Sequence, residues 1–347
     1  MARLRVALSG DFRKPDGSLT FPMFDLSPLE DDPAVEMVWV EPVDGVIPAA
    51  GLEGCHGLIL LAPRFTAESI PASGTLMAVA RFGVGYDNVD VAACTAAGIA
   101  VVITPSGVRR PVAVAVITYM LALTQKLVIK DRLVRGGPEG WARRVDHMGT
   151  GLVGKTLGQL GIGNIGAEVF RLAKPFDMRF IAHDPYADPA LAAELGIELV
   201  GLEDVFRQSD VLSVSVPLSE ATRHLVNAER LALMKPSAIL INTARGPLVD
   251  QKALYAALID GTIAGAGLDV YEIEPAPADE PLFGLDTVIG APHALCWTDE
   301  CFAGNGAADV AAMKAIAAGR APEGVVNRDV LQSAPFRERL AAFAERA

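Results

Sequence analysis

Three side chains capable of chemistry each follow an apolar run in the second half of the chain: Arg245, Glu274 and His293. An arginine guanidinium offers a rigid fork to a carboxylate and polarises a neighbouring carbonyl. A histidine is the usual general acid and base near neutral pH, and a glutamate bonded to it fixes its tautomer and stabilises its protonated form. These residue types predict a site that binds a carboxylate and transfers a proton. The apolar runs are residues 238–242, 265–269 and 287–290.

Each residue also has a simpler interpretation when it is taken alone. His293 could be packed or merely exposed, and Arg245 could cap a helix or form a structural ion pair. Glu274 could be a solvated loop acid before Pro275, and Asp269 could be a helix N-cap. The functional interpretation is favoured because each of these residues follows the end of a strand. The carboxyl ends of these strands lie at the sheet edge where a glycine-rich loop is also expected.

That loop is Gly161-Ile162-Gly163-Asn164-Ile165-Gly166, between an apolar run at 156–160 and a helix-like stretch at 167–173. Gly161 permits a tight turn, Gly163 lets the backbone approach a pyrophosphate, and Gly166 lets the helix pack against the strand. Unpaired N–H groups and the helix dipole attract phosphates at such a helix start. The pattern predicts a dinucleotide site.

Asp184 lies eighteen residues beyond Gly166, where the second strand of the unit should end. Its carboxylate would accept hydrogen bonds from an adenosine ribose and repel a 2′-phosphate. This favours NAD over NADP. Glycine-rich turns also occur in ordinary loops, so the cofactor prediction depends on strand, helix and acid occurring together.

Composition is that of a globular enzyme. The chain has 347 residues, more than one core usually supports, so two domains are expected. A net charge of -12 argues against nucleic acid or an acidic membrane as a partner; this inference concerns the whole chain, which also has local basic pairs at Arg109-Arg110 and Arg143-Arg144. The 4 cysteines show no metal-ligand spacing and suggest a reducing compartment, so we expect no metal site.

No segment predicts membrane insertion or export. The longest apolar stretch, 112–123, is shorter than a membrane span and fits a buried helix. The first ten residues resemble a β-strand more than a signal peptide. We therefore expect a cytoplasmic protein with no membrane partner.

Apolar strand-like runs alternate with helix-like segments, which predicts an α/β protein with two doubly wound parallel sheets. A break at Thr104–Gly107 and a return of the chain after residue 294 give a first domain of 1–104 plus 295–347 and a second of 105–294. A cleft is expected between them, at the carboxyl ends of the second sheet's strands. The predicted strands are 6–8, 57–61, 76–80 and 99–103 in the first sheet, and 157–162, 179–183, 211–216, 238–242, 265–269 and 287–290 in a six-stranded second sheet, with a long helix at 112–135 between the two sets.

Several segments together resemble one family, the D-isomer-specific 2-hydroxyacid dehydrogenases. They are Arg81–Asp90, Gly154–Gly166, Asn242–Asp250, Gly267–Pro275 with Pro292-His293, and the closing Gly324–Asp329. The resemblance runs from about residue 55 to residue 331. It implies a flavodoxin-like substrate domain and a Rossmann NAD domain.

The resemblance also implies roles for the reactive residues. Arg245 would hold the carboxylate and 2-oxo group of a substrate, and His293 would donate a proton to the oxygen as hydride arrives from NADH. Glu274 would hold the imidazole. The backbone N–H groups of Val84 and Gly85, on the other domain, would bind the substrate carboxylate, and closure would assemble the site.

The family further implies a set of residues around NAD. Asp269 would contact the nicotinamide carboxamide, and a loop at Val216-Pro217 and Thr222 would lie beside the adenosine and pyrophosphate. The helix after Pro111 resembles a dimer helix, which implies a homodimer. The complete cofactor set is Gly161, Gly163, Asn164, Ile165, Gly166, Asp184, Val216, Pro217, Thr222, Thr243, Ala244, Arg245, Asp269 and His293.

Glyoxylate or hydroxypyruvate is the expected substrate. The chain departs from the family pattern after His293, where Trp297 is expected near the substrate, and Val116 replaces a common glutamate. A formate-oxidising relative would pair its histidine with glutamine, which Glu274 argues against. An NAD(H)-sensing corepressor or scaffold could keep the same fold, because fold does not establish activity. Turnover of a 2-oxo acid distinguishes these alternatives.

Overall fold

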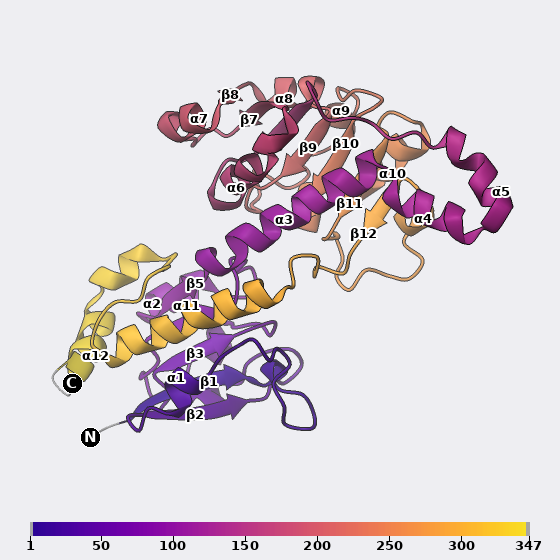
Figure 1. Cartoon of the computed structure of the whole chain (residues 1–347). Helices are drawn as coiled ribbons and strands as arrows, with labels where there is room; N and C mark the ends of the chain where they lie inside the picture. The colour runs from indigo at the N-terminus through magenta and orange to yellow at the C-terminus, as the bar shows by residue number, and fades with distance from the viewer. Residues whose placement is uncertain (1–2, 345–347) are drawn as a thin grey trace. The chain divides into compact units, whose positions relative to one another are not determined.

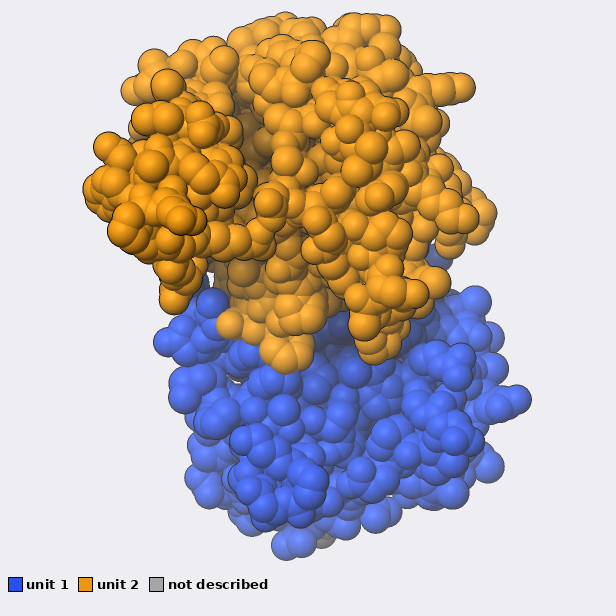
Figure 2. Space-filling model, turned by 90° about the vertical axis from the view of Figure 1, so that its right-hand side faces the viewer, with its two compact units in different colours: residues 1–108, 298–347 blue, residues 109–297 orange. Residues whose placement is uncertain are grey.

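The computed structural model describes residues 3–344 and divides the chain into two compact units (Figure 2). The first unit comprises 1–108 and 298–347, and the second comprises 109–297. Both boundaries lie a few residues beyond the predicted ones. The expected break at Thr104–Gly107 is instead the start of helix α3 (Pro105–Thr124), because a proline is tolerated in the first turn of a helix.

The first unit contains a parallel sheet of five strands in the order β2-β1-β3-β4-β5 (Figure 1). This is the flavodoxin-type doubly wound order. Strand β2 was not predicted from the sequence; it lies at the sheet edge, where most of its residues are only half-buried. The strands are β1 (Leu4–Ser9), β2 (Val35–Val40), β3 (Gly57–Leu60), β4 (Ala78–Arg81) and β5 (Ala100–Ile103).

Both faces of this sheet are covered by apolar clusters. One cluster joins Leu8 and Ile59 to Met313 of helix α11 (Asp299–Ala317). Phe12 and Phe24, each 1% exposed, join the same cluster, so the segment 12–33 contributes to the core. The other helices are α1 (Ser27–Glu30), α2 (Val91–Ala96) and α12 (Ala334–Ala344), with short 3-10 turns η1 (Gly10–Phe12), η2 (Ala49–Leu52), η3 (Ala67–Ser69) and η8 (Arg328–Gln332).

The second unit contains a parallel sheet of seven strands in the order β12-β11-β10-β9-β6-β7-β8. The chain reverses direction across the sheet between β6 and β9, which is the Rossmann switch point where dinucleotides bind. Six strands were predicted; the seventh is β8, an edge strand of 3 residues, too short to give a periodic signal. The strands are β6 (Thr156–Leu160), β7 (Arg179–His183), β8 (Ile197–Leu199), β9 (Val211–Val214), β10 (Ile239–Asn242), β11 (Gly265–Leu268) and β12 (Val288–Gly290).

The long helix predicted at 112–135 is in fact two helices, α3 and α4 (Leu127–Arg135). Lys126 between them has a left-handed backbone with φ 52, which an α-helix cannot continue. The remaining helices are α5 (Gly137–Ala142), α6 (Asn164–Ala173), α7 (Pro189–Leu195), α8 (Leu202–Gln208), α9 (Ala228–Leu231) and α10 (Gln251–Ile259), with 3-10 turns η4 (Arg143–Asp146), η5 (Lys174–Phe176), η6 (Gly246–Leu248) and η7 (Pro281–Gly284).

Helix α3 is a core helix. Within residues 3–344 it alone has the length and hydropathy of a membrane span, but 56% of that stretch is buried inside the protein. Val116, Tyr119 and Met120 are at most 1% exposed and belong to the apolar cluster of the second unit. The buried helix expected at 112–123 is therefore present, and it extends from Pro105 to Thr124.

Candidate active site

The glycine-rich loop connects β6 to α6 at the switch point. Gly161 has φ +87, which only glycine adopts easily, and a methyl group there would meet the Ser215 carbonyl oxygen at 2.8 Å. A methyl group on Gly166 would lie 2.2 Å from the Gly161 carbonyl oxygen, so the helix can begin this close to the strand only with glycine. A methyl group on Gly163, by contrast, would meet nothing within 4 Å. The loop therefore has two glycines required by packing and one facing open space.

The open space at Gly163 fits a phosphate group. Gly163 is the N-cap of α6, and Asn164 and Ile165 begin the helix, where backbone N–H groups point out of the helix end. The three glycines and these two residues thus lie where the sequence analysis placed them. The loop can receive the pyrophosphate of a dinucleotide.

Asp184 follows β7 and is tied to the glycine-rich loop. One carboxylate oxygen accepts a hydrogen bond from the N–H of Ile162 at 2.9 Å, and the other accepts one from the N–H of Tyr186, also at 2.9 Å. These bonds hold the carboxylate beside the loop with spare lone pairs, because each oxygen can accept a second bond. The position suits a ribose hydroxyl.

The segment after β9 closes the other side of the glycine-rich loop. Val216 lies against Gly161, where an added methyl group would meet its Cγ1 at 3.0 Å. Thr222 donates its hydroxyl to the Pro217 carbonyl at 2.7 Å and accepts from the Ser219 N–H at 2.8 Å. The Thr222 hydroxyl therefore stabilises the turn that Pro217 begins.

Arg245 is held in a tight turn after β10. The Asn242 side chain, 1% exposed, accepts from the Ala244 N–H at 3.1 Å and donates to the Arg245 carbonyl at 2.9 Å. Thr243 and Ala244 form the rest of this turn. Gly246 then packs directly on Tyr271, since a methyl group there would lie 1.8 Å from the Tyr271 carbonyl oxygen. This contact brings the Arg245 turn against the segment that leads to Glu274.

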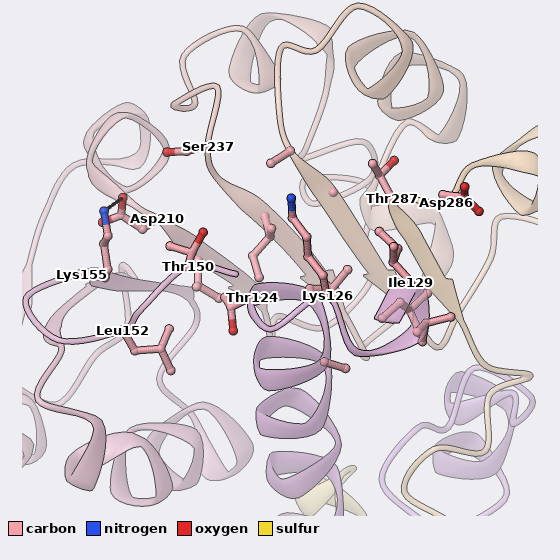
Figure 3. Close-up of a pocket in the computed structure, with 18 residues that line it drawn as sticks. Thr124, Lys126, Ile129, Thr150, Leu152, Lys155, Asp210, Ser237, Asp286 and Thr287 are labelled. Atoms are coloured by element: carbon pink, nitrogen blue, oxygen red, sulfur yellow. Dashed lines mark ion pairs between the residues drawn. The ribbon is translucent and has the colours of Figure 1, made fainter. Parts of the chain in front are cut away.

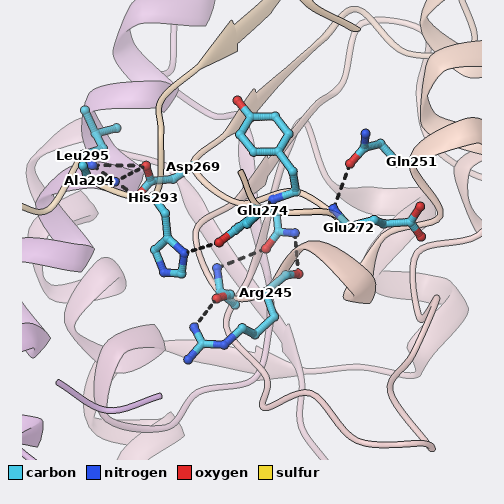
Figure 4. A network of polar contacts seen from close by, with 11 residues as sticks. Arg245, Gln251, Asp269, Glu272, Glu274, His293, Ala294 and Leu295 are labelled. Atoms are coloured by element: carbon cyan, nitrogen blue, oxygen red, sulfur yellow. Dashed lines mark hydrogen bonds and ion pairs between the residues drawn. The ribbon is translucent and has the colours of Figure 1, made fainter. Parts of the chain in front are cut away.

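Glu274 and His293 form the hydrogen-bonded pair that the sequence predicted (Figure 4). His293 Nδ1 lies 2.7 Å from one Glu274 oxygen, and the other oxygen accepts from the Tyr271 N–H at 2.9 Å. Burial alone would raise the pKa of Glu274, but the hydrogen bonds from His293 and Tyr271 lower it below its ordinary value. Glu274 is therefore an anion that supports a protonated imidazole.

His293 is accessible on its other side. Its side chain is 45% exposed, and within the described chain no residue bonds to Nε2. Its backbone has φ 54, an uncommon conformation for a non-glycine residue. Because Nδ1 is engaged by Glu274, Nε2 is the atom left to exchange a proton with a substrate.

Asp269 holds the backbone that carries His293. Its carboxylate, 3% exposed, accepts hydrogen bonds from the N–H groups of Ala294 at 2.9 Å and Leu295 at 3.1 Å. Burial raises the pKa of Asp269, and these two bonds only partly oppose the rise. The N-cap interpretation of Asp269 is wrong: the carboxylate binds the strand-end turn after His293, not a helix start.

Sequence reasoning missed a second imidazole–carboxylate pair near this edge. His224 Nε2 lies 2.5 Å from a Glu272 oxygen, and the Glu272 N–H donates to Gln251 at 3.0 Å. The backbone N–H of His224 donates to the carbonyl of Pro247 at 2.8 Å, two residues after Arg245. The two residues are 48 positions apart, so only the fold reveals the pair.

A separate hollow of the second unit lies elsewhere. Figure 3 shows it at the opposite edge of the sheet, where Lys155, Asp210 and Thr287 precede the strands rather than follow them. It is separate from the glycine-rich loop and from His293. Among residues 3–344, no group of three or more His, Cys, Asp or Glu side chains could hold a metal ion.

Two further expectations can be compared with the structure. Arg109 and Arg110 pair with Glu168, which is 6% exposed and also pairs with Arg171, so they form a structural ion-pair cluster.

In the first unit, the N–H groups of Val84 and Gly85 donate no hydrogen bond to any residue that the structure describes. Such unsatisfied donors can bind an anion.

Comparisons with known proteins agree with this geometry. The family model "D-isomer specific 2-hydroxyacid dehydrogenase, NAD binding domain" matches residues 117–294. A glyoxylate reductase of Korarchaeum cryptofilum is 40% identical over 287 residues, which are 82% of this chain and 86% of the relative. A hydroxypyruvate reductase of Thermotoga maritima is 41% identical over 235 residues, 67% of this chain and 74% of that protein. The structure of an NADPH-dependent glyoxylate/hydroxypyruvate reductase from Sinorhizobium meliloti, bound to NADP and malonate, is 30% identical and superimposes with a TM-score of 0.79, covering 94% of this chain and 98% of that one.

Proposed function

This chain belongs to the D-isomer specific 2-hydroxyacid dehydrogenase family, and from that premise we propose that it reduces a small 2-oxo acid to the corresponding 2-hydroxy acid. It is an NAD(P)-dependent oxidoreductase of that family. Glyoxylate and hydroxypyruvate are the proposed substrates, because a relative that is 40% identical is named a glyoxylate reductase and one that is 41% identical is named a hydroxypyruvate reductase. The observation that supports catalysis most directly is the Glu274–His293 pair at 2.7 Å beside the Arg245 turn.

In the proposed reaction each residue has one task. The Arg245 guanidinium binds the substrate carboxylate and polarises the 2-oxo group. His293 Nε2 donates a proton to the carbonyl oxygen, and Glu274 stabilises the protonated imidazole until that transfer. The N–H groups of Val84 and Gly85 bind the substrate carboxylate. A reduced nicotinamide, when bound, supplies the hydride.

We propose NADH as the preferred cofactor. The Asp184 carboxylate is held by the N–H groups of Ile162 and Tyr186 beside the glycine-rich loop, where it would accept bonds from a ribose and repel a 2′-phosphate. The similar enzyme from Sinorhizobium meliloti is NADPH-dependent, so membership of the family does not fix the preference. The argument depends on the charge at position 184 in this chain.

The test is turnover of NADH and NADPH by the purified protein with glyoxylate, hydroxypyruvate, pyruvate, phenylpyruvate, 2-oxoisocaproate and 2-oxoglutarate. We expect one of the first two to be reduced best and NADH to be preferred. His293→Gln should lose at least a hundredfold in kcat and retain NADH affinity, because only proton transfer is removed.

His224→Gln is the matched control, since it disrupts the other imidazole–carboxylate pair of the same unit. It should lose much less activity than His293→Gln. Equal losses would contradict the role of His293. No turnover of any acid despite NADH binding would favour the sensing or scaffold alternative.

A further inference from the structure

The loop that follows β4 in the first unit is fixed at one residue. Gly83 donates its N–H to the Thr104 hydroxyl at 2.9 Å, and its carbonyl accepts from the Thr104 N–H, also at 2.9 Å. Gly83 has φ +129, and a methyl group there would lie 2.2 Å from an Arg81 guanidinium nitrogen. This backbone conformation requires glycine, so the loop leaves the strand in one defined direction.

Thr104 is in turn oriented by a residue from helix α11. Its hydroxyl donates to the Asn305 side-chain oxygen at 2.7 Å, and both residues are buried, at 0% and 3% exposed. A hydroxyl has one proton. Because that proton is given to Asn305, the lone pairs of the hydroxyl face the Gly83 N–H.

Close contact between the backbones keeps Asn305 in range of Thr104. A methyl group on Gly107 would lie 2.4 Å from the Asn305 backbone nitrogen, and one on Gly304 would lie 2.8 Å from the Gly107 α-carbon. The start of α3 and the start of α11 therefore touch at two glycines. On the other side, the Asn305 amide donates to Cys301 Sγ at 3.6 Å, so its amide orientation is also specified.

The next two residues of the loop are in the opposite situation. The N–H groups of Val84 and Gly85 find no acceptor in the described part of the chain, whereas the Gly83 N–H immediately before them is buried and bonded. A rigid base followed by two unsatisfied donors is an arrangement suited to binding an anion, because the donors need no reorganisation.

We propose that Thr104 and Asn305 are positioning residues for the loop that binds the substrate carboxylate. They act through Gly83 and do not touch the substrate. The proposal depends on the function proposed above for the N–H groups of Val84 and Gly85. A buried threonine–asparagine pair could instead serve stability alone, so the test must separate substrate affinity from folding.

The experiment measures KM for the best 2-oxo acid, kcat, KM for NADH and the melting temperature. Thr104→Val removes the hydroxyl and keeps the shape; we expect KM for the 2-oxo acid to rise about tenfold, the effect of one lost hydrogen bond of typical strength. The KM for NADH should stay within about twofold, because the glycine-rich loop belongs to the other unit. Thr104→Ser keeps the hydroxyl and should restore the wild-type KM.

Asn305→Ala provides an independent measurement if Thr104→Val folds poorly, and it should raise the same KM with NADH unaffected. Thr95→Val is the matched control: Thr95 is also bonded in the first unit, to Val91 and Asn327, but has no bond to this loop. We expect it to leave KM unchanged.

Two results would overturn the proposal. One is a Thr104→Ser enzyme as impaired as Thr104→Val, because the hydroxyl would then be irrelevant. The other is a lower melting temperature with unchanged KM in the Thr104 and Asn305 variants, which would make the pair structural only. A wild-type protein without turnover would overturn the proposed function itself, and the positioning role with it.

Discussion

The Glu274 carboxylate accepts hydrogen bonds from two different parts of the site, the Tyr271 N–H and His293 Nδ1. Glu274→Gln keeps a side chain of the same shape but removes the negative charge that stabilises a protonated imidazole. We expect kcat/KM for reduction to fall by at least tenfold and the alkaline limb of its pH profile to move to lower pH. The measurement is a pH–rate profile of both proteins; identical alkaline limbs would contradict this role.

Asp309 on helix α11 is a buried acid that has no role in the proposed reaction. It is 0% exposed, and within the described chain neither carboxylate oxygen has a hydrogen-bond partner. Burial raises the pKa of Asp309 well above its usual 3.8, and the nearby Arg81 guanidinium opposes this only in part. The folded protein therefore keeps the proton that the unfolded chain releases.

The sign of the resulting pH dependence follows from that shift. Below about pH 4 both states are protonated and Asp309 costs no ionisation energy; as pH rises toward the folded-state pKa, the unfolded state gains stability. The Asp309→Asn substitution removes this pH-dependent destabilisation, because an asparagine side chain does not ionise. We expect the Asp309→Asn variant to have a higher melting temperature than the wild type near pH 7, with a gap between the two proteins that widens as the pH rises above the unfolded-state pKa. A constant gap measured by calorimetry would refute the ionisation argument.

Single residues also show how far the sequence alone could lead. Arg245, Glu274 and His293 were predictable because each follows a strand, and parallel strands end at one edge. Asn305 and Asp309 were not, because a polar residue on a helix is usually exposed and nothing local indicates that this face is buried. Pairs such as His224–Glu272 come together only through the tertiary fold.

At the scale of elements, two glycines of the glycine-rich turn have different roles: Gly166 is required by packing, and Gly163 by the proposed cofactor site. Gly166→Ala would place a methyl group 2.2 Å from the Gly161 carbonyl, whereas Gly163→Ala would meet nothing within 4 Å. We expect Gly166→Ala to lower both the melting temperature and NADH affinity. Gly163→Ala should keep the melting temperature and weaken NADH binding at least tenfold, because its methyl group occupies space proposed for the pyrophosphate.

Titration of NADH fluorescence, with thermal unfolding in parallel, checks this pair of variants. A Gly163→Ala protein that binds NADH as tightly as wild type would contradict the proposed position of the phosphates. The comparison is informative because Gly163 has φ -63, a value that alanine also adopts, so backbone strain does not enter.

Elements were predicted best where they are buried on both faces. Strands β3 and β10 have every residue buried and appear in the sequence as apolar runs. Edge strands β2 and β8 were missed because they are partly exposed and lack such a run. The break at Lys126 was also missed, since the residues on either side of it have good helix propensity and the αL conformation has no sequence signal here.

At the scale of the whole molecule, the segment from α4 to Met148 has an apolar surface that belongs to none of the apolar clusters of the two units. Trp141 is 59% exposed, Val145 71% and Met148 80%. These residues line one shallow groove with Val134 and Leu133. Exposed apolar side chains gathered in this way mark an interface more often than a free surface. We therefore propose a homodimer that buries this segment.

The variant Trp141→Ser/Val145→Asp tests the dimer, because it removes apolar area and places a charge where the partner would exclude water. We expect the wild type to elute with twice the monomer mass in light-scattering chromatography at micromolar concentration, and the double variant to elute as a monomer. Val43→Asp is the matched control, since Val43 is a similarly exposed valine, at 61%, that belongs to the first unit and not to this segment. If the control dissociates as readily, or if the double variant stays dimeric, the interface lies elsewhere; a monomeric wild type would exclude the dimer.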